Sequence, residues 1–179
     1  MEPREDQGPP SAHLALLEPA TLAAAERYRS ILLFADSDDT CFVARRMARE
    51  TAADWGLAHL AGDMALCVSE LVGNAVLHAT PDGRSTSAPG DRLITVAFRA
   101  WPKWLFIEVS DEDSTPPMLP VGELIHPGTP ATEPDDLLPD SGRGLFLVQT
   151  FANSVWWAPR DDGGKSVFCR FDLKPDTHR

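Results

Sequence analysis

The segment at residues 64–79 combines an apolar helical repeat with two polar side chains on one helix face. Glu70 and Asn74 are four residues apart, so their side chains project about one turn apart from the same side. A carboxylate that can take a proton and an amide oxygen that can ligate a hard cation would then point into one site. An ordinary amphipathic helix with two polar residues on its wet face fits the same pair. The apolar positions are Met64, Val68, Leu71, Val72, Ala75 and Val76.

Three later segments contain other positions that could complete such a site. Residues 103–111 are rich in β-forming residues and predict a strand that ends at Asp111. Gly142 and Gly144 precede an apolar helical pattern, and glycine lets the backbone N–H groups of a helix start approach a phosphate. Residues 162–171 predict a turn that leads into a final strand.

In this order and spacing the four segments resemble the GHKL ATPases, the superfamily of gyrase, Hsp90, histidine kinases and MutL. The resemblance covers residues 31–173 and is strongest to the short single-domain branch, the anti-sigma-factor serine kinases and their actinobacterial relatives. The matching positions are Glu70–Asn74 for the N box, Asp111 for the start of the G1 box, Gly142–Gly144 for the G2 box, and Gly164, Ser166 and Phe168 for the last box.

The resemblance implies a role for each matching residue. Glu70 would be the general base that acts on a water or on a serine hydroxyl of a partner, and Asn74 would ligate Mg²⁺ that arrives with ATP. Asp111 would accept a hydrogen bond from the exocyclic amine of adenine, which favours ATP over GTP. The other ATP-binding positions would be Gly142, Arg143, Gly144, Leu145 and Ser166, with Ser166 supporting the adenine pocket through Asp111 or a water.

The sequence departs from the superfamily at the G1 box. Where D-x-G-x-G is usual, the chain has Asp111-Glu-Asp-Ser-Thr115, with no glycine. Side chains at positions 113 and 115 would crowd the pocket, and the carboxylates of Glu112 and Asp113 would repel phosphates if they faced them. Asp111 is followed five residues later by Pro116 and Pro117, a pattern that resembles the actinobacterial short branch.

Composition excludes several classes of protein. With 179 residues, 43% of them hydrophobic, the chain is long enough for one domain with a substantial core. A net charge of −11 argues against a nucleic-acid-binding surface. We expect no membrane span and no signal peptide, hence a cytoplasmic protein. The three cysteines, Cys41, Cys67 and Cys169, are too few and scattered for a disulfide framework or a metal site, and we expect buried thiols.

The expected fold is an α+β two-layer sandwich, an antiparallel or mixed sheet with helices packed on one face, which is the Bergerat ATP-binding fold of the superfamily. We expect a partly disordered extension at residues 1–30, the domain at 31–173 with an ATP lid at 112–141, and a tail at 174–179. The expected strands are 30–35, 91–100, 103–111, 154–159 and 165–173, and the expected helices are 40–55, 60–79 and 143–153.

The leading hypothesis for function is an ATP-dependent serine/threonine protein kinase that binds a sigma factor and phosphorylates an anti-sigma-antagonist protein. The glycine-free G1 box favours an alternative, a catalytically inactive module that binds nucleotide or sequesters a transcription regulator. A detached histidine-kinase catalytic domain is a third possibility, and the length excludes a gyrase- or Hsp90-like machine with a transducer domain. The sequence leaves open whether the chain forms a homodimer.

Overall fold

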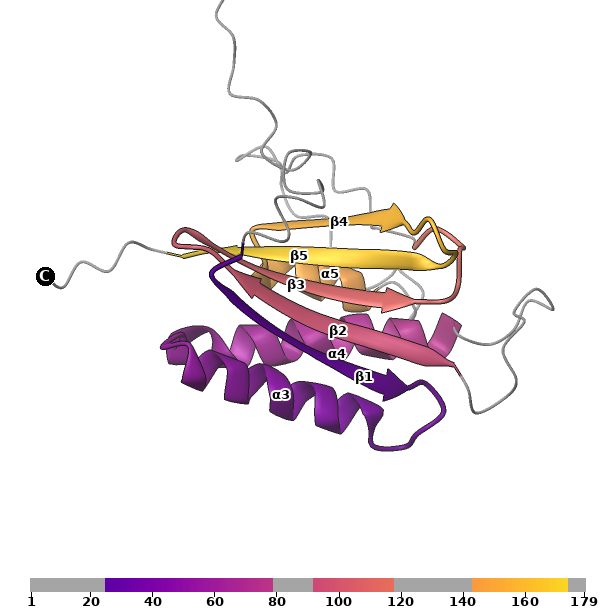
Figure 1. The fold of residues 1–179 in the computed structure, drawn as a ribbon, viewed down its shortest axis with the longest axis horizontal. Coiled ribbons are helices and arrows are strands. Elements are labelled where there is room, and N and C mark those ends of the chain that lie inside the picture. Colours follow the sequence, from indigo (N-terminus) through magenta and orange to yellow (C-terminus); the bar gives the residue numbers. More distant parts are fainter. Residues whose placement is uncertain (1–24, 79–91, 118–142, 174–179) are drawn as a thin grey trace, which may run out of the picture.

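The computed structural model describes residues 25–78, 92–117 and 143–173, which form a two-layer α+β domain. Figure 1 shows one twisted sheet with the helices gathered on a single face. The strand order is β1-β2-β3-β5-β4, and each neighbouring pair is antiparallel. The predicted fold class is therefore confirmed, with an antiparallel rather than a mixed sheet among the described residues.

The elements occur in the predicted order. The strands are β1 (Arg27–Phe34), β2 (Leu93–Ala100), β3 (Trp104–Asp111), β4 (Ser154–Pro159) and β5 (Lys165–Asp172). The helices are α3 (Thr40–Asp54), α4 (Ala61–His78) and α5 (Arg143–Phe151), with a 3-10 turn at Ala58–Leu60 before α4. The largest departure is β1, which begins at Arg27 and not at residue 30, because residues 27–30 pair with the end of β2.

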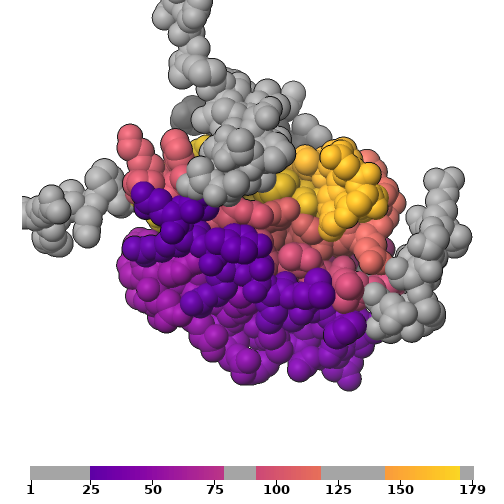
Figure 2. Space-filling model, in the orientation of Figure 1, coloured from indigo at the N-terminus to yellow at the C-terminus, as the bar shows by residue number. Residues whose placement is uncertain are grey.

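β1 and β4 are the two edges of the sheet, and Figure 2 shows the indigo β1 and the yellow C-terminal strands on opposite sides of the molecule. The core lies between the sheet and the helices, because alternate strand residues face α3, α4 and α5. Its centre comprises Met64, Val68, Val72, Ile94, Val96, Phe98, Leu105, Ile107, Val109 and Val148, all of them buried. Of the three free thiols, Cys67 and Cys169 are buried and Cys41 is half-buried.

The segment Ala58–His78 is long and apolar enough to cross a membrane by length and composition alone, with a mean hydropathy of 1.4. Length and composition therefore do not by themselves support the expectation of no membrane span. Met64, Val68 and Val72 of this segment are completely buried against the sheet and its neighbouring helices. Their packing identifies α4 as the central helix of the core.

Two contacts in this framework position the site. The register of β3 and β5 sets Asp111, the last residue of β3, opposite Lys165, the first residue of β5. The packing of α5 on α4 brings the start of α5 against the middle of α4. One site can therefore draw residues from segments that are far apart in the sequence.

Candidate functional site

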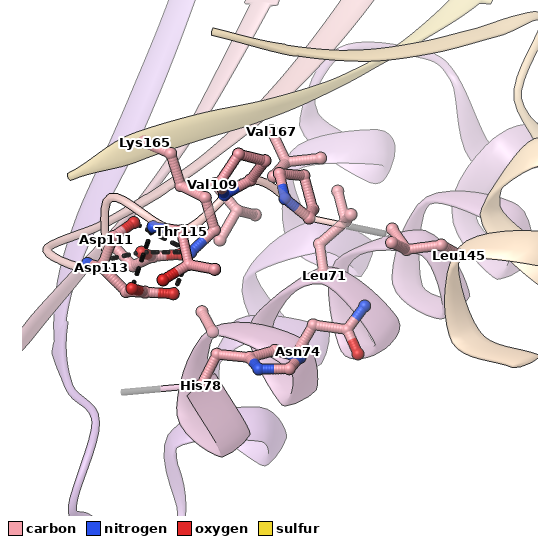
Figure 3. Close-up of a pocket in the computed structure, with 13 residues that line it drawn as sticks. Leu71, Asn74, His78, Val109, Asp111, Asp113, Thr115, Leu145, Lys165 and Val167 are labelled. Atoms are coloured by element: carbon pink, nitrogen blue, oxygen red, sulfur yellow. Dashed lines mark hydrogen bonds and ion pairs between the residues drawn. The ribbon is translucent and has the colours of Figure 1, made fainter. Parts of the chain in front are cut away.

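A cavity of about 190 Å³ lies between the C-terminal half of α4, the end of β3, and the starts of α5 and β5 (Figure 3). Its walls are apolar near the sheet and polar at the β3–β5 end. The lining residues are Leu71, Asn74, Ala75, His78, Val109, Asp111, Asp113, Thr115, Pro116, Pro117, Leu145, Lys165 and Val167.

The α4 wall presents one face of the helix to the cavity. Asn74 and His78 are four residues apart and both line the cavity. In Figure 3 the amide of Asn74 lies toward Leu145, on the side away from the charged cluster at Asp111. The Nδ2 atom of Asn74 is buried and makes no hydrogen bond with the described residues. A buried amide nitrogen without a partner is costly, so this atom is a candidate donor to a ligand.

Gly144 lies directly against the two polar residues of α4. A Cβ at position 144 would be 2.5 Å from Oε2 of Glu70 and 3.7 Å from Nδ2 of Asn74. The start of α5 can reach this position because residue 144 has no side chain. Glu70, Asn74 and the backbone of Gly144 therefore meet beside the Asn74 end of the cavity, although of the three only Asn74 lines it.

The opposite end of the cavity is a cluster of charged side chains from β3, its following turn and β5 (Figure 3). The ammonium Nζ of Lys165 donates to Oδ1 of Asp111 at 2.9 Å, to Oδ2 of Asp113 at 2.8 Å and to the carbonyl oxygen of Asp113 at 3.0 Å. Asp111 and Lys165 are 3% and 4% exposed, so this ion pair is shielded from water.

The environment shifts the two carboxyl groups in opposite directions. Burial raises the pKa of Asp111, and the hydrogen bond and the charge of Lys165 offset only part of that rise. Burial would also raise the pKa of Asp113, but hydrogen bonds from Lys165 and Thr115 outweigh it and lower the pKa of that carboxyl. Asp111 is therefore the carboxyl of this cluster that is harder to ionise.

Two consecutive side-chain-to-backbone turns shape the segment after β3. The backbone N–H of Asp113 donates to Oδ1 of Asp111 at 2.9 Å, and the backbone N–H of Thr115 donates to Oδ1 of Asp113 at 3.0 Å. Aspartate side chains stabilise such turns without glycine. Asp113 and Thr115 do line the cavity, as expected, but the carboxylate of Asp113 is turned toward Lys165.

Gly164 closes the same corner from the β4–β5 turn. Its φ of +83° lies in the left-handed region, and a Cβ there would be 2.0 Å from the carbonyl oxygen of Asp111. Its backbone N–H donates to the hydroxyl of Ser114 at 2.9 Å. Only glycine fits at this point, because any Cβ would overlap the backbone at the end of β3.

The sequence profile of the histidine kinase-like ATPase domain matches residues 34–171, which is most of the chain and includes every described element of the site. The chain belongs to the histidine kinase-like ATPase domain family. The predicted membership of the GHKL superfamily is confirmed. No curated protein matches the sequence significantly.

Two solved structures resemble this ATPase domain. The crystal structure of the RsbU and RsbW domains of Rv1364c from Mycobacterium tuberculosis is 18% identical with a TM-score of 0.53, and the match covers 83% of this chain and 33% of that one. The mycobacterial sensor histidine kinase MprB is 12% identical with a TM-score of 0.43, covering 81% of this chain and 99% of that one. The present chain spans about a third of the first of these structures.

The ATPase domain brings most, but not all, of the predicted site residues together. Asn74, Asp111 and Leu145 line the cavity, and Glu70 and Gly144 meet at its end. Arg143 begins α5, and Gly142 and the predicted lid residues 118–141 lie outside the described residues.

Ser166 lies away from the cavity. Its hydroxyl is 2.7 Å from that of Ser110 and donates to Oε1 of Glu108 at 3.0 Å, and these residues line a separate hollow on the other face of the sheet. Strand alternation explains the placement, because Lys165 and Val167 take the cavity side of β5 and Ser166 must face the opposite way.

Lys165 is the charged site residue that sequence reasoning missed. Lys165 stands two residues before Val167, so a period of two along β5 places it on the cavity side. This alternation predicts which face of β5 carries Lys165, but it does not predict which residue Lys165 pairs with. The pairing with Asp111 depends on the register between β3 and β5, which joins residues 54 positions apart.

The site fits Mg²⁺ bound together with a nucleotide better than Mg²⁺ alone. Within the described parts of the chain, no group of three or more His, Cys, Asp or Glu residues could hold a metal ion. Asn74 lines the cavity from α4 and has an amide oxygen of the kind that ligates Mg²⁺, which completes its shell with phosphate oxygens and waters. Its Nδ2 atom, which has no partner among the described residues, is a donor and would contact an acceptor such as a phosphate oxygen and not the metal. The cavity, at about 190 Å³, is smaller than the roughly 300–1,000 Å³ of typical ligand pockets.

Proposed function

We propose that this chain is an ATP-binding regulatory protein that phosphorylates a serine or threonine of a protein partner. The observation that carries the proposal is the arrangement at the two ends of one cavity: a buried carboxylate at Asp111, and the Glu70–Asn74 pair held against the backbone of Gly144. The Asp111 end fits the adenine ring of a nucleotide, and the Glu70–Asn74 end fits its phosphates, as expected for the family.

The α4 end supplies the groups that phosphoryl transfer needs. The amide oxygen of Asn74 would hold Mg²⁺, which supplies the charge that neutralises the phosphates. Glu70 would take the proton of the acceptor hydroxyl, since its Oε2 and the amide of Asn74 lie within 4 Å of a single point beside Gly144. The N–H groups at the start of α5 would donate to phosphate oxygens, and the absence of a Cβ at Gly144 lets them approach.

The β3–β5 end supplies the base selectivity. Adenine presents an amine donor at the position where guanine presents a carbonyl acceptor. A buried aspartate at the floor of the cavity accepts from the first and repels the second. We therefore expect ATP, and not GTP, as the nucleotide.

The partner is proposed from the resemblance to the anti-sigma-factor kinases. We propose that a second protein presents the acceptor hydroxyl to Glu70, in line with the phosphoryl group. We propose a sigma factor or an anti-sigma-antagonist protein in that position, and a cytoplasmic site of action. The partner would determine when transfer occurs.

A second candidate function is favoured by the cluster at Asp111. One oxygen of the predicted adenine acceptor already binds Lys165, and two acidic side chains line this end of the cavity. A domain of this family with such a corner could bind nucleotide without transfer, or could sequester a transcription regulator with no nucleotide. The kinase is preferred because Glu70, Asn74 and Gly144 would have no reason to converge in a sequestering module.

The test is a calorimetric titration with Mg·ATP and Mg·GTP, followed by incubation with [γ-³²P]ATP and candidate antagonist proteins. The proposal expects Mg·ATP to bind and Mg·GTP to bind much more weakly. It also expects label on a serine or threonine of the partner, with little ATP hydrolysis in its absence. Asp111→Asn should weaken ATP binding by about 1.5–3 kcal/mol, the range for hydrogen bonds to charged groups. Equal affinities for ATP and GTP would overturn the assignment of Asp111 to adenine recognition. ATP binding without labelling of a partner would favour the second candidate function, a regulator that binds nucleotide without phosphoryl transfer.

A further inference from the structure

We infer that Lys165 is a positioning residue for adenine recognition: it holds Asp111 ionised through Oδ1, so that Oδ2 is left as the acceptor for the adenine amine. The inference rests on the proposed function and adds to it a residue to which the resemblance gives no role. It is carried by the hydrogen bonds of the cluster at the β3–β5 end of the cavity (Figure 3).

The hydrogen bonds of Lys165 exclude a direct contact with phosphate. A protonated lysine has three N–H donors, and here they are taken by Oδ1 of Asp111, Oδ2 of Asp113 and the carbonyl oxygen of Asp113. The side chain is 5% exposed, so the ammonium cannot swing to another partner without breaking a buried network. Lys165 therefore acts on a ligand through Asp111.

The two oxygens of Asp111 are used differently. Oδ1 accepts from Lys165 and from the backbone N–H of Asp113, both at 2.9 Å. The described residues donate no hydrogen bond to Oδ2. This asymmetry restrains the plane of the carboxylate and leaves Oδ2 as the available acceptor on a residue that lines the cavity.

Ionisation of Asp111 depends on the same contact. Burial favours the neutral acid, and the ammonium of Lys165 opposes that effect. A neutral acid would carry a proton on one oxygen and could present a donor to the adenine amine, which is itself a donor. The other titratable groups near this carboxyl are Asp113 on the same turn and His78 on α4, while α5 contributes only the apolar Leu145 to the cavity wall.

Lys165 also explains how the glycine-free G1 segment is compatible with a nucleotide. Asp113 stands where the superfamily has a glycine, and its charge would otherwise face the cavity. The ammonium of Lys165 binds that carboxylate and the carbonyl oxygen of the same residue. One buried cation thus compensates both aspartates.

The experiment compares ATP with purine riboside triphosphate, which lacks the exocyclic amine, in wild type and in Lys165→Met. Dissociation constants of both Mg²⁺ complexes are measured by calorimetry at pH 5.5 and pH 8. We expect wild type to prefer ATP by about tenfold or more at both pH values. In Lys165→Met the preference should fall to within about threefold at pH 5.5 and recover in part at pH 8, because the carboxylate returns as pH rises.

Several controls separate positioning from stability. A merely structural role would weaken both nucleotides equally and leave their ratio unchanged. Lys103→Met removes an exposed lysine at the far end of β3 and should leave the ratio as in wild type. Repeating the pH comparison in a His78→Gln background removes the histidine that lines the cavity. If Lys165→Met does not fold, Lys165→Met combined with Asp113→Asn removes one carboxylate together with its partner.

A measurement on the wild-type protein tests the inference even if no variant of Lys165 folds. The side-chain ¹³C shift of Asp111, assigned with Asp111→Asn, reports its ionisation directly, and we expect a carboxylate at pH 7. A carboxyl still protonated at pH 7, or an unchanged ATP preference in Lys165→Met, would overturn the inference while the proposed function stands. Failure of wild type to distinguish the two nucleotides would instead overturn the base assignment itself.

Discussion

The two ends of the cavity are built in different ways. At the α4 end, Glu70 and Asn74 come from a single helix, and their common direction follows from helical geometry. At the β3–β5 end, Asp111 and Lys165 come from strands that are far apart in the sequence and meet only through strand register. The first end is a local consequence of sequence and the second is a tertiary one. A substitution that pushes the backbones of neighbouring segments apart should therefore destabilise the β3–β5 end more than the α4 end.

The largest expected effect is at Gly164. Gly164→Ala would place a Cβ 2.0 Å from the carbonyl oxygen of Asp111 at a φ of +83°. We expect a loss of about 3 kcal/mol or more in the free energy of unfolding, measured by urea denaturation. Gly163→Ala is the matched control, since its φ is +92° but a Cβ there meets nothing within 4 Å. It should lose only about 1–2 kcal/mol. Equal losses would show that the contact with Asp111 has no energetic weight.

The next effect tests the α4 end by chemistry rather than by stability. Glu70→Ala should leave the dissociation constant of Mg·ATP nearly unchanged and should reduce partner labelling by about 10²–10⁴-fold, the usual contribution of a general base. Glu50→Ala removes an exposed carboxylate from α3 and should change neither quantity. Wild-type labelling by Glu70→Ala would contradict the general-base role.

A smaller effect is expected where α5 meets α4. In Gly144→Ala the new Cβ would be 2.5 Å from Oε2 of Glu70, the far end of a flexible side chain, so Glu70 can move aside. Unfolding free energy should change by less than about 1 kcal/mol, whereas partner labelling should fall severalfold. Gly62→Ala, with no atom within 4 Å of the added Cβ, should leave labelling unchanged. A large loss of stability in Gly144→Ala would mean that α4 and α5 cannot adjust to the added Cβ. The two ends of the cavity would then respond alike to an added side chain, contrary to the comparison above.

The smallest effect is a pH dependence within the Asp111–Asp113–Lys165 cluster. The pKa of Asp113 is lowered by folding, so its ionised form stabilises the fold above its ordinary value of 3.8, and this contribution is lost as pH falls through the lower folded value. Asp113→Asn should thus be less stable than wild type at pH 7, and the difference should shrink as pH falls below 3.8. Unfolding free energies measured from pH 2.5 to 7 test this.

Asp111 should show the opposite sign in the same series. Its pKa is raised by burial, so its contribution to stability is full below the ordinary value of 3.8 and is lost as pH rises through the raised folded value. Asp111→Asn removes one partner of the buried Lys165 and should lose stability, but by less at pH 7 than below pH 3.8. The same pH trend in both variants would show that the two carboxyls are not distinguished by burial.

The predictions from sequence succeed where the relevant geometry is local. The repeat around residues 64–76 placed α4 correctly, and the spacing of Glu70 and Asn74 gave their shared face. Ser166 shows the limit of such reasoning. A motif position marks it for the adenine pocket, but the pleat of β5 turns it to the other face of the sheet.

The sequence by itself determined the order of the elements, the α+β class and the side chains of the α4 end, because hydrophobic period and residue spacing act over one or two helical turns. Tertiary structure alone decided that Lys165 neutralises Asp111 and Asp113, that Gly164 must be glycine, and that Gly144 lies against Glu70. Each of these depends on which segments pack together. A pairing between residues 54 positions apart is set by strand register and by the burial of the whole core, and no local pattern encodes it.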